Sequence, residues 1–370
     1  MYLREVFMKN NGPIKDLHLE FSFDSEDQPI PHIMVGKNGS GKTNLLSVIA
    51  DSLMQGASKS FSDVLTHQEG GGQSYFRIVG GSLITFGEKY GLSVLRFSDE
   101  EGQYFYHENF GVVEKQDLDA LLPESLQAGI TWGGSDSSKE IEIDREKATK
   151  VYQSGVYAFF PTSRSEDPHW FNTGSIHPDE FDIAPKFSNN LGRKMYVERG
   201  INTFAQWLLG VITDSRMNVL GAEYTGEDKS EQTPQVMVQM DFEPFIESQK
   251  PLIWSDYLLK SILDDESARF VWTGHRDARK VAISTGPDGR ILRGLTSLSG
   301  GQATMLAAFG TILRYADEMG QGPGQVEGVV VIDELDAHMH IDLQLRALPK
   351  MIKYFPKYNL SSLATHLFSY

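Results

Sequence analysis

The most informative stretch of this 370-residue chain is Gly36-Lys-Asn-Gly-Ser-Gly-Lys-Thr43. It follows an apolar run, His32-Ile-Met-Val35, that indicates a buried strand. After it, Leu45, Ile49 and Leu53 recur at helical spacing. Strand, glycine-rich loop and helix, with the pattern G-x-x-x-x-G-K-[ST], predict a phosphate-binding loop, because its backbone N–H groups point inward and the helix N-terminus favours an anion. The alternative is an ordinary glycine turn.

The residues of this loop have distinct expected roles. Lys42 is expected to reach the β- and γ-phosphates of a nucleotide, and the Thr43 hydroxyl is expected to ligate Mg²⁺. The loop and the residue after it are expected to line the nucleotide site: Gly36, Lys37, Asn38, Gly39, Ser40, Gly41, Lys42, Thr43 and Asn44.

A second helix start carries the sequence Leu298-Ser-Gly-Gly-Gln302. In the segment that follows, Met305, Phe309 and Ile312 lie on one face of a predicted helix. The serine hydroxyl and the free N–H groups after it converge on one point, which is an anion-binding arrangement. The same pattern also serves as an ordinary serine N-cap, so this motif alone leaves both interpretations open.

The run Gly328-Val-Val-Val-Ile-Asp-Glu334 is apolar and β-branched up to two carboxylates, which predicts a parallel strand buried on both faces. Adjacent strand residues point to opposite sides, so Asp333 and Glu334 are expected to have different tasks. We predict that Asp333 lies near Mg²⁺ and that Glu334 faces the γ-phosphate and orients the attacking water. The alternative is a strand that runs into an acidic turn.

A further run, Leu360-Ser-Ser-Leu-Ala-Thr-His366, places a histidine at the end of a neighbouring strand. Such a histidine is either a loop residue or a sensor of the γ-phosphate, and its order in the chain favours the sensor. Another group, Asp336, His338 and His340, could be a metal cluster on an extended strand, although it also falls where a loop should follow the acidic strand end.

These four elements occur in one order, and in this the chain resembles the ABC-type ATPases. Its opening residues, from Tyr2 to Lys15, resemble the N-terminal strand pair of the SMC, RecF, Rad50 and OLD branch. The resemblance implies an α/β head with a mixed β-sheet and an antiparallel β subdomain. It implies ATP and Mg²⁺ as cofactors, ATP hydrolysis, and Glu334, His366 and Lys42 as catalytic residues. The motif that contacts the ATP of a second copy is Ser299, Gly300, Gly301 and Gln302, so ATP is expected to join a head-to-tail homodimer.

The long distance between the phosphate loop and Ser299 contains no heptads, so we expect a compact globular insertion instead of coiled-coil arms. The expected parts are an N-terminal ATPase lobe with an antiparallel β subdomain (1–111), an insertion and helical region (112–270), and a C-terminal ATPase lobe (271–370). Within the insertion, 112–150 and 222–250 are acidic and broken by Gly, Pro and Ser, which predicts loops or peripheral insertions.

Two stretches, from Tyr157 to Trp170 and from Ile332 to His340, resemble segments of stand-alone bacterial ATPases of anti-phage systems, namely the Septu ATPase subunit and retron-associated ATPases. The resemblance implies a switch that regulates a separate nuclease subunit of HNH type, and a retron reverse transcriptase with its RNA–DNA as a further partner. Ser163 and Arg164 stand where the family has a glutamine, so we expect no direct metal ligand there. The alternative function is a RecF-like repair clamp on duplex DNA.

Composition narrows the choice between these functions. The chain has 50 acidic and 34 basic side chains and a net charge of −16, which disfavours non-specific binding of nucleic acid. The densest basic stretch, from His275 to Lys280, is either a nucleic-acid contact or a solvated hairpin loop.

The remaining sequence features concern the cellular location of the protein and the length of the chain. The absence of cysteine excludes disulfides and a thiolate zinc site. The N-terminal residues lack an export signal and no apolar run reaches about 18 residues, so we expect a cytoplasmic protein without a membrane span. The family usually adds at least another strand and a helix after the histidine, whereas four residues follow His366 in this sequence.

Overall fold

The structure is a computed structural model of the chain. The residues that it describes are 1–64, 66–67, 73–74, 84–127, 130, 137–162, 189–217, 219–224, 236–240, 242–274, 279–286, 289, 291–336 and 339–364. Several residues singled out from the sequence lie outside this set: Ser163, Arg164, His338, His366 and residues 275–278 of the basic stretch.

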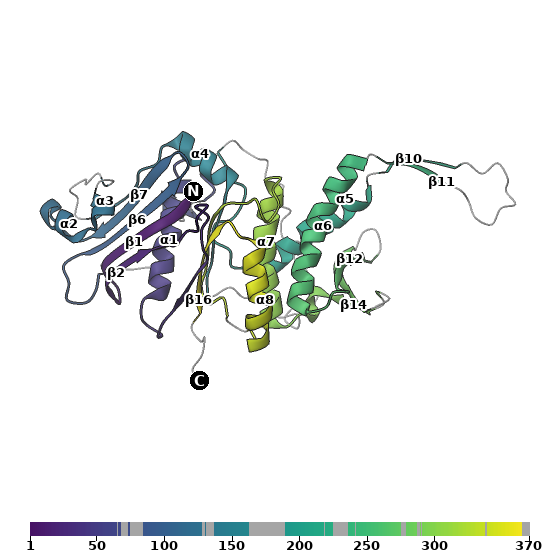
Figure 1. Cartoon of the computed structure of the whole chain (residues 1–370). Coiled ribbons are helices and arrows are strands. Elements are labelled where there is room, and N and C mark those ends of the chain that lie inside the picture. The colour runs from purple at the N-terminus through teal and green to yellow at the C-terminus, as the bar shows by residue number, and fades with distance from the viewer. Residues whose placement is uncertain are drawn as a thin grey trace.

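A four-stranded sheet in which all strands are parallel forms the centre of the molecule. Its order is β3 (His32–Val35), β16 (Tyr358–Ala364), β15 (Gly328–Ile332) and β9 (Val156–Phe160). Figure 1 shows this sheet between an antiparallel sheet on one side and a group of long helices on the other. Strands from both ends of the chain thus bring their carboxyl ends to one edge.

The central strands are buried on both faces, as the β-branched run in β15 predicted. Val330 and Ile332 pack against the helices, whereas Val329 and Val331 face α1 (Lys42–Ala57) on the other side. Successive strand residues point to opposite faces, so a strand covered on both sides is apolar at every position. The predicted helix after the glycine-rich loop is α1, and it fills the space between the two sheets.

A five-stranded antiparallel sheet packs against the other side of α1. Its order is β2 (Ile14–Glu20), β1 (Tyr2–Asn11), β6 (Gly91–Asp99), β7 (Gly102–Phe110) and β8 (Ser137–Ile141). The predicted N-terminal hairpin is therefore present. We expected a mixed sheet. In the described part of the chain the antiparallel strands and the parallel strands form separate sheets, since β1 pairs with β6 in the first and β3 pairs with β16 in the second.

Two short helices, α2 (Lys115–Leu121) and α3 (Glu124–Gln127), cover the outer face of the antiparallel sheet. The buried carboxylate of Glu5 in β1 contacts α3, because it accepts a hydrogen bond from Ser125 Oγ at 2.6 Å. It also accepts one from Arg96 Nε at 2.9 Å. Burial raises the pKa of Glu5, but the hydrogen bonds from Ser125, His18 and Arg96 outweigh it and the pKa falls below its usual value.

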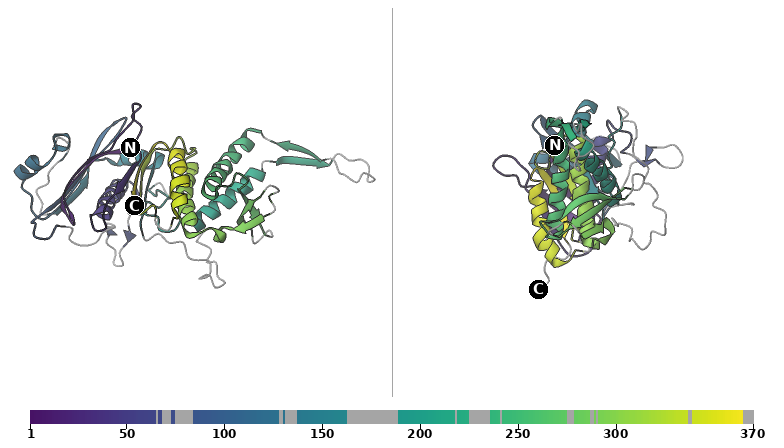
Figure 2. Two further views of the ribbon diagram at one scale, coloured as in Figure 1. Left: turned by 60° about the horizontal axis from the view of Figure 1, so that its bottom comes forward. Right: turned by 90° about the vertical axis from the view of Figure 1, so that its right-hand side faces the viewer.

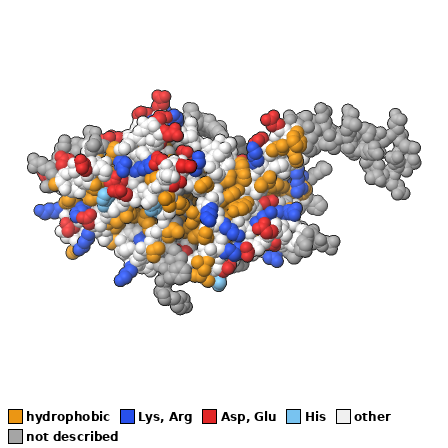
Figure 3. Space-filling view, viewed as in Figure 1, with side chains coloured by type: hydrophobic (Ala, Val, Ile, Leu, Met, Phe, Trp, Pro, Cys, Tyr) orange, Lys and Arg blue, Asp and Glu red, His pale blue; other side chains and the backbone are white. Residues whose placement is uncertain are grey.

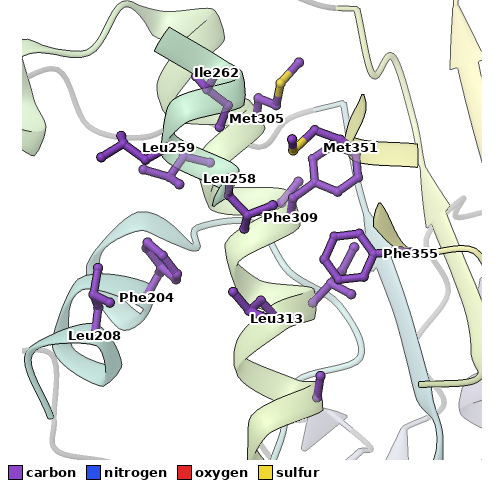
Figure 4. Packing of buried hydrophobic residues seen from close by; sticks show 14 of the residues in the cluster. Phe204, Leu208, Leu258, Leu259, Ile262, Met305, Phe309, Leu313, Met351 and Phe355 are labelled. Atoms are coloured by element: carbon purple, nitrogen blue, oxygen red, sulfur yellow. The ribbon is translucent and has the colours of Figure 1, made fainter. Parts of the chain in front are cut away.

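A group of four long helices lies on the other side of the parallel sheet, and the last two of them in the chain lie nearest to it (Figure 1). The four helices are α5 (Ile201–Met217), α6 (Phe242–Leu263), α7 (Gly300–Glu318) and α8 (Ile341–Tyr354). Figure 4 shows Phe204, Leu258 and Phe309, from three of these helices, in one buried cluster. At Gly310 the approach is so close that a Cβ atom would lie 2.7 Å from the Phe204 ring, so larger residues are excluded there.

Beside these helices lies a small antiparallel sheet. Its strands are β12 (Arg269–Thr273), β13 (Lys280–Thr285) and β14 (Ile291–Gly294). Two strands of two residues each, β4 (Thr66–His67) and β5 (Gln73–Ser74), form a separate pair.

The two segments expected to be loops or peripheral insertions contain regular structure. Segment 112–150 includes α2, α3, β8 and the start of α4 (Arg145–Ser154), and segment 222–250 includes the start of α6. Proline misled the prediction, because Pro244 lies in the first turn of α6, where a missing N–H costs nothing. The expected compact insertion also contains an extended arm: β10 (Val219–Tyr224) and β11 (Val236–Met240) form a ribbon that projects from the body (Figures 1 and 2).

Candidate functional site

The glycine-rich loop lies at the edge of the parallel sheet where the strands end. β3 ends at Val35 and α1 begins at Lys42, so the loop from Gly36 to Gly41 connects the edge strand to a buried helix. In open parallel sheets, the crevice outside the carboxyl ends of the strands is the usual place for a ligand.

The loop is closed upon itself by the side chain of Lys42. Its Nζ atom donates hydrogen bonds to the carbonyl oxygens of Gly36 at 2.7 Å and Lys37 at 3.0 Å. Gly41, with φ of +94°, is the left-handed residue before α1, and a Cβ atom there would lie 2.5 Å from Ile14 of β2. Both the backbone conformation and the close approach of β2 therefore require glycine.

Three side chains from distant parts of the chain meet beside the first turn of α1. The Asp333 carboxylate, which is 1% exposed, follows β15 directly. Its Oδ2 atom accepts a hydrogen bond from Thr43 Oγ1 at 3.1 Å and another from Thr162 Oγ1 at 2.6 Å. Thr43 is the second residue of α1 and Thr162 follows β9, so the order of the strands creates this group.

Glu334 has an unusual backbone conformation, with φ of +46°. A non-glycine residue in the left-handed region is uncommon and costs about 1 to 3 kcal/mol unless its surroundings fix it. Its neighbour Asp333 is fixed, because the Asp333 N–H donates to the Phe160 carbonyl at 2.9 Å. After β15, Asp333 is thus buried, whereas its neighbour Glu334 is partly exposed.

The Ser299 motif forms an exposed helix start. η2 (Leu295–Ser297) leads into it, and α7 begins at Gly300. The Ser299 hydroxyl accepts from the Gln302 N–H at 3.4 Å, and the Gln302 side-chain oxygen accepts from the Ser299 N–H at 2.9 Å. This capping box stabilises the turn through contacts among its own residues. Ser299 and Gly300 are exposed, so the motif faces outward.

A groove of about 720 Å³ lies next to the phosphate loop, between β2 and β3. Ile14 and Leu17 of β2 and Val35 of β3 contribute apolar surface, and Lys42 lies at the loop end of the groove. Val35 is 59% exposed although it belongs to the parallel sheet. The groove is therefore a surface on which an apolar ring attached to a phosphate chain could rest.

The other sequence candidates have structural roles where they are described. His340 caps α8, since its Nδ1 atom accepts from the Asp342 N–H at 3.3 Å, and this engages one ligand atom of the suspected metal cluster. In the basic stretch, the Arg279 guanidinium lies 4.5 Å from the centre of the Trp272 ring, and Lys280 is the first residue of β13. His366 lies outside the described residues, so its role stays a prediction.

Sequence reasoning missed Thr162. We expected no metal ligand in this loop and considered only the two residues after it. The signal was present, because Thr162 lies two residues after the apolar run that forms β9, much as Asp333 lies one residue after β15. Only the pairing of β9 with β15, however, brings the two side chains together.

No protein-family model matches this chain, and no match was found among curated proteins. Solved structures similar to it include SMC head domains. The one from Thermotoga maritima shares 12% identity, covering 99% of this chain and 89% of that chain, with a TM-score of 0.40. The Smc head domain with an extended coiled coil bound to the C-terminal domain of ScpA, derived from Pyrococcus furiosus, shares 13% identity, with 99% and 90% covered and a TM-score of 0.45.

A third similar structure is an SmcHead bound to the C-winged helix domain of ScpA, with 13% identity, 99% of this chain and 90% of that chain covered, and a TM-score of 0.45. At this level the likeness assigns no function. Among the described residues, no helix is both long and apolar enough to span a membrane.

Proposed function

We propose that this chain is an ABC-type ATPase, which binds ATP with Mg²⁺ and hydrolyses it to ADP and phosphate. The observation that carries the proposal is the buried Asp333 carboxylate, bonded by the hydroxyls of Thr43 and Thr162 next to the glycine-rich loop. Mg²⁺ is a hard cation that takes oxygen ligands, so this donor set fits it. Thr43 and Asp333 are the residues that would hold the ion.

The proposed roles of Lys42 and Glu334 follow from their positions. Lys42 and the N–H groups of the loop hold the phosphates. Glu334 orients or deprotonates the attacking water. His366 is proposed as the sensor of the γ-phosphate on the family resemblance alone. Mg²⁺, when bound, stabilises the charge that develops on the phosphoryl oxygens. The apolar groove between β2 and β3 offers the adenine ring a surface beside Lys42.

The exposed Ser299 motif supports a dimeric site. An exposed helix start presents its N–H groups to an anion that another molecule brings. We therefore propose that Ser299, Gly300, Gly301 and Gln302 close over the ATP of a second copy. In this head-to-tail homodimer, ATP joins two copies about a two-fold axis and hydrolysis releases them, so the ATPase acts as a switch.

The proposed role of the switch is to regulate a partner nuclease of HNH type in an anti-phage complex, with a retron reverse transcriptase and its RNA–DNA as a further partner. It rests on the resemblance of the two stretches around β9 and β15. The net charge of −16 makes the alternative, a RecF-like clamp on duplex DNA, less favourable.

The ATPase proposal is tested with the variant Glu334→Gln. We expect hydrolysis to fall by roughly 100-fold or more while ATP binding is retained, because the amide cannot activate water. Phosphate release and binding of a fluorescent ATP analogue measure the two effects. Wild-type hydrolysis in this variant would refute the role of Glu334, and loss of binding would indicate misfolding.

The partner is tested with the same variant, tagged and purified from its native host in the presence of ATP. Co-elution of a small nuclease or a reverse-transcriptase complex would support the defence function. Recovery of the ATPase alone on long duplex DNA would support the repair clamp instead.

A further inference from the structure

Two arginine side chains from different elements lie over the ring of Trp272 in β12. The guanidinium carbon of Arg279 is 4.5 Å from the centre of the ring, and that of Arg216 is 5.5 Å from it. Arg216 belongs to the last turn of α5, and Arg279 directly precedes β13. Both distances lie within the range of about 6 Å over which an aromatic ring attracts a cation. The ring thus gathers two positive charges on one small surface.

The position of the Trp272 ring is fixed by the core of the helical region. Trp272 is half-buried and packs against the buried cluster of that region. Phe270, on the same side of β12, is 3% exposed, and its ring centre lies 5.9 Å from that of Phe204. All five residues of β12 pair with β13. Side chains that rest on a fixed ring lose less conformational freedom when they bind a ligand.

The charges of Arg216 and Arg279 are not neutralised within the described part of the chain. Neither guanidinium has an ion pair or a hydrogen bond there, and both residues are exposed. This is unusual in a chain with 50 acidic and 34 basic side chains, and Figure 3 shows acidic and basic side chains interspersed on one face of the molecule. Contact with a ring uses none of the five N–H donors of a guanidinium, so these donors remain for a ligand.

We propose that Arg216 and Arg279, held over Trp272, form a binding site for phosphate groups that is separate from the glycine-rich loop. A planar guanidinium matches two oxygens of a phosphate with parallel N–H bonds. Two guanidiniums at one ring suit a ligand that carries several phosphates, which is either a strand of nucleic acid or a free polyphosphate chain. The site lies beyond the proposed ATPase function, because β12 and α5 belong to the helical side of the molecule and α1 to the other side (Figure 1).

Lys280 provides a matched control for the site. It is exposed and basic, and it follows Arg279 directly. The register of the sheet pairs Trp272 with Val281, and successive strand residues point to opposite faces, so Lys280 lies on the face of β13 away from the ring. An acidic chain repels phosphates over most of its surface, and any binding therefore depends on a local basic group. Only the site over Trp272 makes Arg279 more important than its neighbour.

The test is fluorescence anisotropy of a labelled oligothymidylate of about 20 nucleotides with the full chain, without ATP. We expect salt-dependent binding. Arg279→Gln should lower the affinity about tenfold, whereas Lys280→Gln, which removes the same charge, should leave it within about twofold. The double variant of Arg216→Gln and Arg279→Gln should also make the dependence of log affinity on log salt shallower by about 1, because each phosphate contact on a single strand contributes about 0.7.

The ring is tested separately from the charges. Trp272→Leu keeps both arginines and removes the aromatic face, so the affinity should fall by about threefold or more. Trp272→Phe keeps a ring and should restore it. Urea denaturation of both variants identifies a loss of folding. A folded Trp272→Leu variant with unchanged affinity would overturn the role of the ring.

A second probe, sodium tripolyphosphate, distinguishes the two sources of phosphate. Because the glycine-rich loop is also expected to bind it, the informative quantity is the difference between wild type and the double arginine variant in calorimetric titrations. A loss of oligothymidylate binding in that variant would identify a nucleic-acid strand as the ligand, and a loss of tripolyphosphate binding alone would identify a free polyphosphate.

Equal binding of both probes by wild type and the double variant would overturn the proposal, as would equal effects of Arg279→Gln and Lys280→Gln. ATP hydrolysis by the double variant should match that of wild type. Failure of this site and failure of the ATPase proposal therefore give different results.

Discussion

The edge of the parallel sheet and the start of α7 are built in opposite ways. At the sheet edge, Thr162 and Thr43 bond to Asp333 although they precede it by 171 and 290 residues in the chain. At the start of α7, Ser299 and Gln302 bond to each other within one turn. The first group exists only when the sheet is assembled, whereas the second needs no more than its own helix.

This difference indicates how the two regions can work. The sheet edge gathers hydroxyl and carboxylate oxygens at a buried position, which suits a metal ion and the chemistry of phosphate. The Ser299 turn is complete by itself and exposed, so it suits a surface offered to another molecule. If so, damage to the sheet edge should impair each copy alone, and damage to the Ser299 turn should matter only between copies.

The largest expected effect is that of Ser299→Arg. A long cation at this exposed turn should block the approach of a second copy, so we expect hydrolysis to fall by about 100-fold or more. ATP binding by the single chain should persist. Parallel measurements of hydrolysis and nucleotide binding test this, and normal hydrolysis would show that the chain acts without the dimeric site.

Thr162→Val should have a smaller effect, confined to the sheet edge. It removes a hydroxyl that donates to the Asp333 carboxylate, and a lost hydrogen bond to a charged group corresponds to roughly 10-fold in rate. Because Thr162 acts through Asp333, the Mg²⁺ concentration for half-maximal hydrolysis should rise. Thr162→Ser, which keeps the hydroxyl, should restore it. An unchanged Mg²⁺ dependence in Thr162→Val would leave Thr162 with a structural role only.

The same difference explains what could be predicted from sequence. The glycine-rich loop, the Ser299 turn and the end of β15 are local patterns, so their elements appear where expected. The Thr162 contact depends on β9 pairing with β15, which no local pattern specifies. α6 was missed because its acidic residues and Pro244 indicated a loop, whereas burial of Leu258, Leu259 and Ile262 stabilises a helix.

Asp256 lies in neither region, and its partly buried carboxylate should make the stability of the protein depend on pH. Burial raises its pKa from 3.8 to about 6, although the Phe270 N–H, Lys260 and Arg269 lower it. Because the folded state holds the proton more tightly, stability should fall as the pH rises from about 4 to about 6. Asp256→Asn retains an acceptor for the Phe270 N–H and loses the charge. We expect it to raise the free energy of unfolding on the order of 1 to 2 kcal/mol at neutral pH.

Urea denaturation of wild type and Asp256→Asn at neutral pH and at pH about 4 tests this, since the difference should vanish at the lower pH. A gain that persists in acid would indicate a packing effect in place of titration. The variant should hydrolyse ATP normally, because the residue belongs to neither region.

The smallest expected effects are changes in the free energy of unfolding, and single substitutions in the two regions should change it in opposite directions. Glu334 is held at φ of +46°, so Glu334→Gly should relieve strain and raise the free energy of unfolding by about 1 kcal/mol, after the greater entropy of an unfolded glycine is included. Ser299 has the relaxed extended backbone of an N-cap, with φ of −63° and ψ of 159°. Ser299→Ala removes the capping oxygen and should lower stability by about 1 kcal/mol.

Both values come from urea denaturation of the nucleotide-free protein, with Glu334→Gln as the control that changes the side chain and keeps the β-carbon. Strained backbone of this kind persists where the surrounding structure fixes it, and it clusters at functional sites. If Glu334→Gly proved less stable than Glu334→Gln, the left-handed turn at Glu334 would not be strained. The proposed difference between the two regions, strain at the sheet edge and a relaxed helix start at Ser299, would then be wrong.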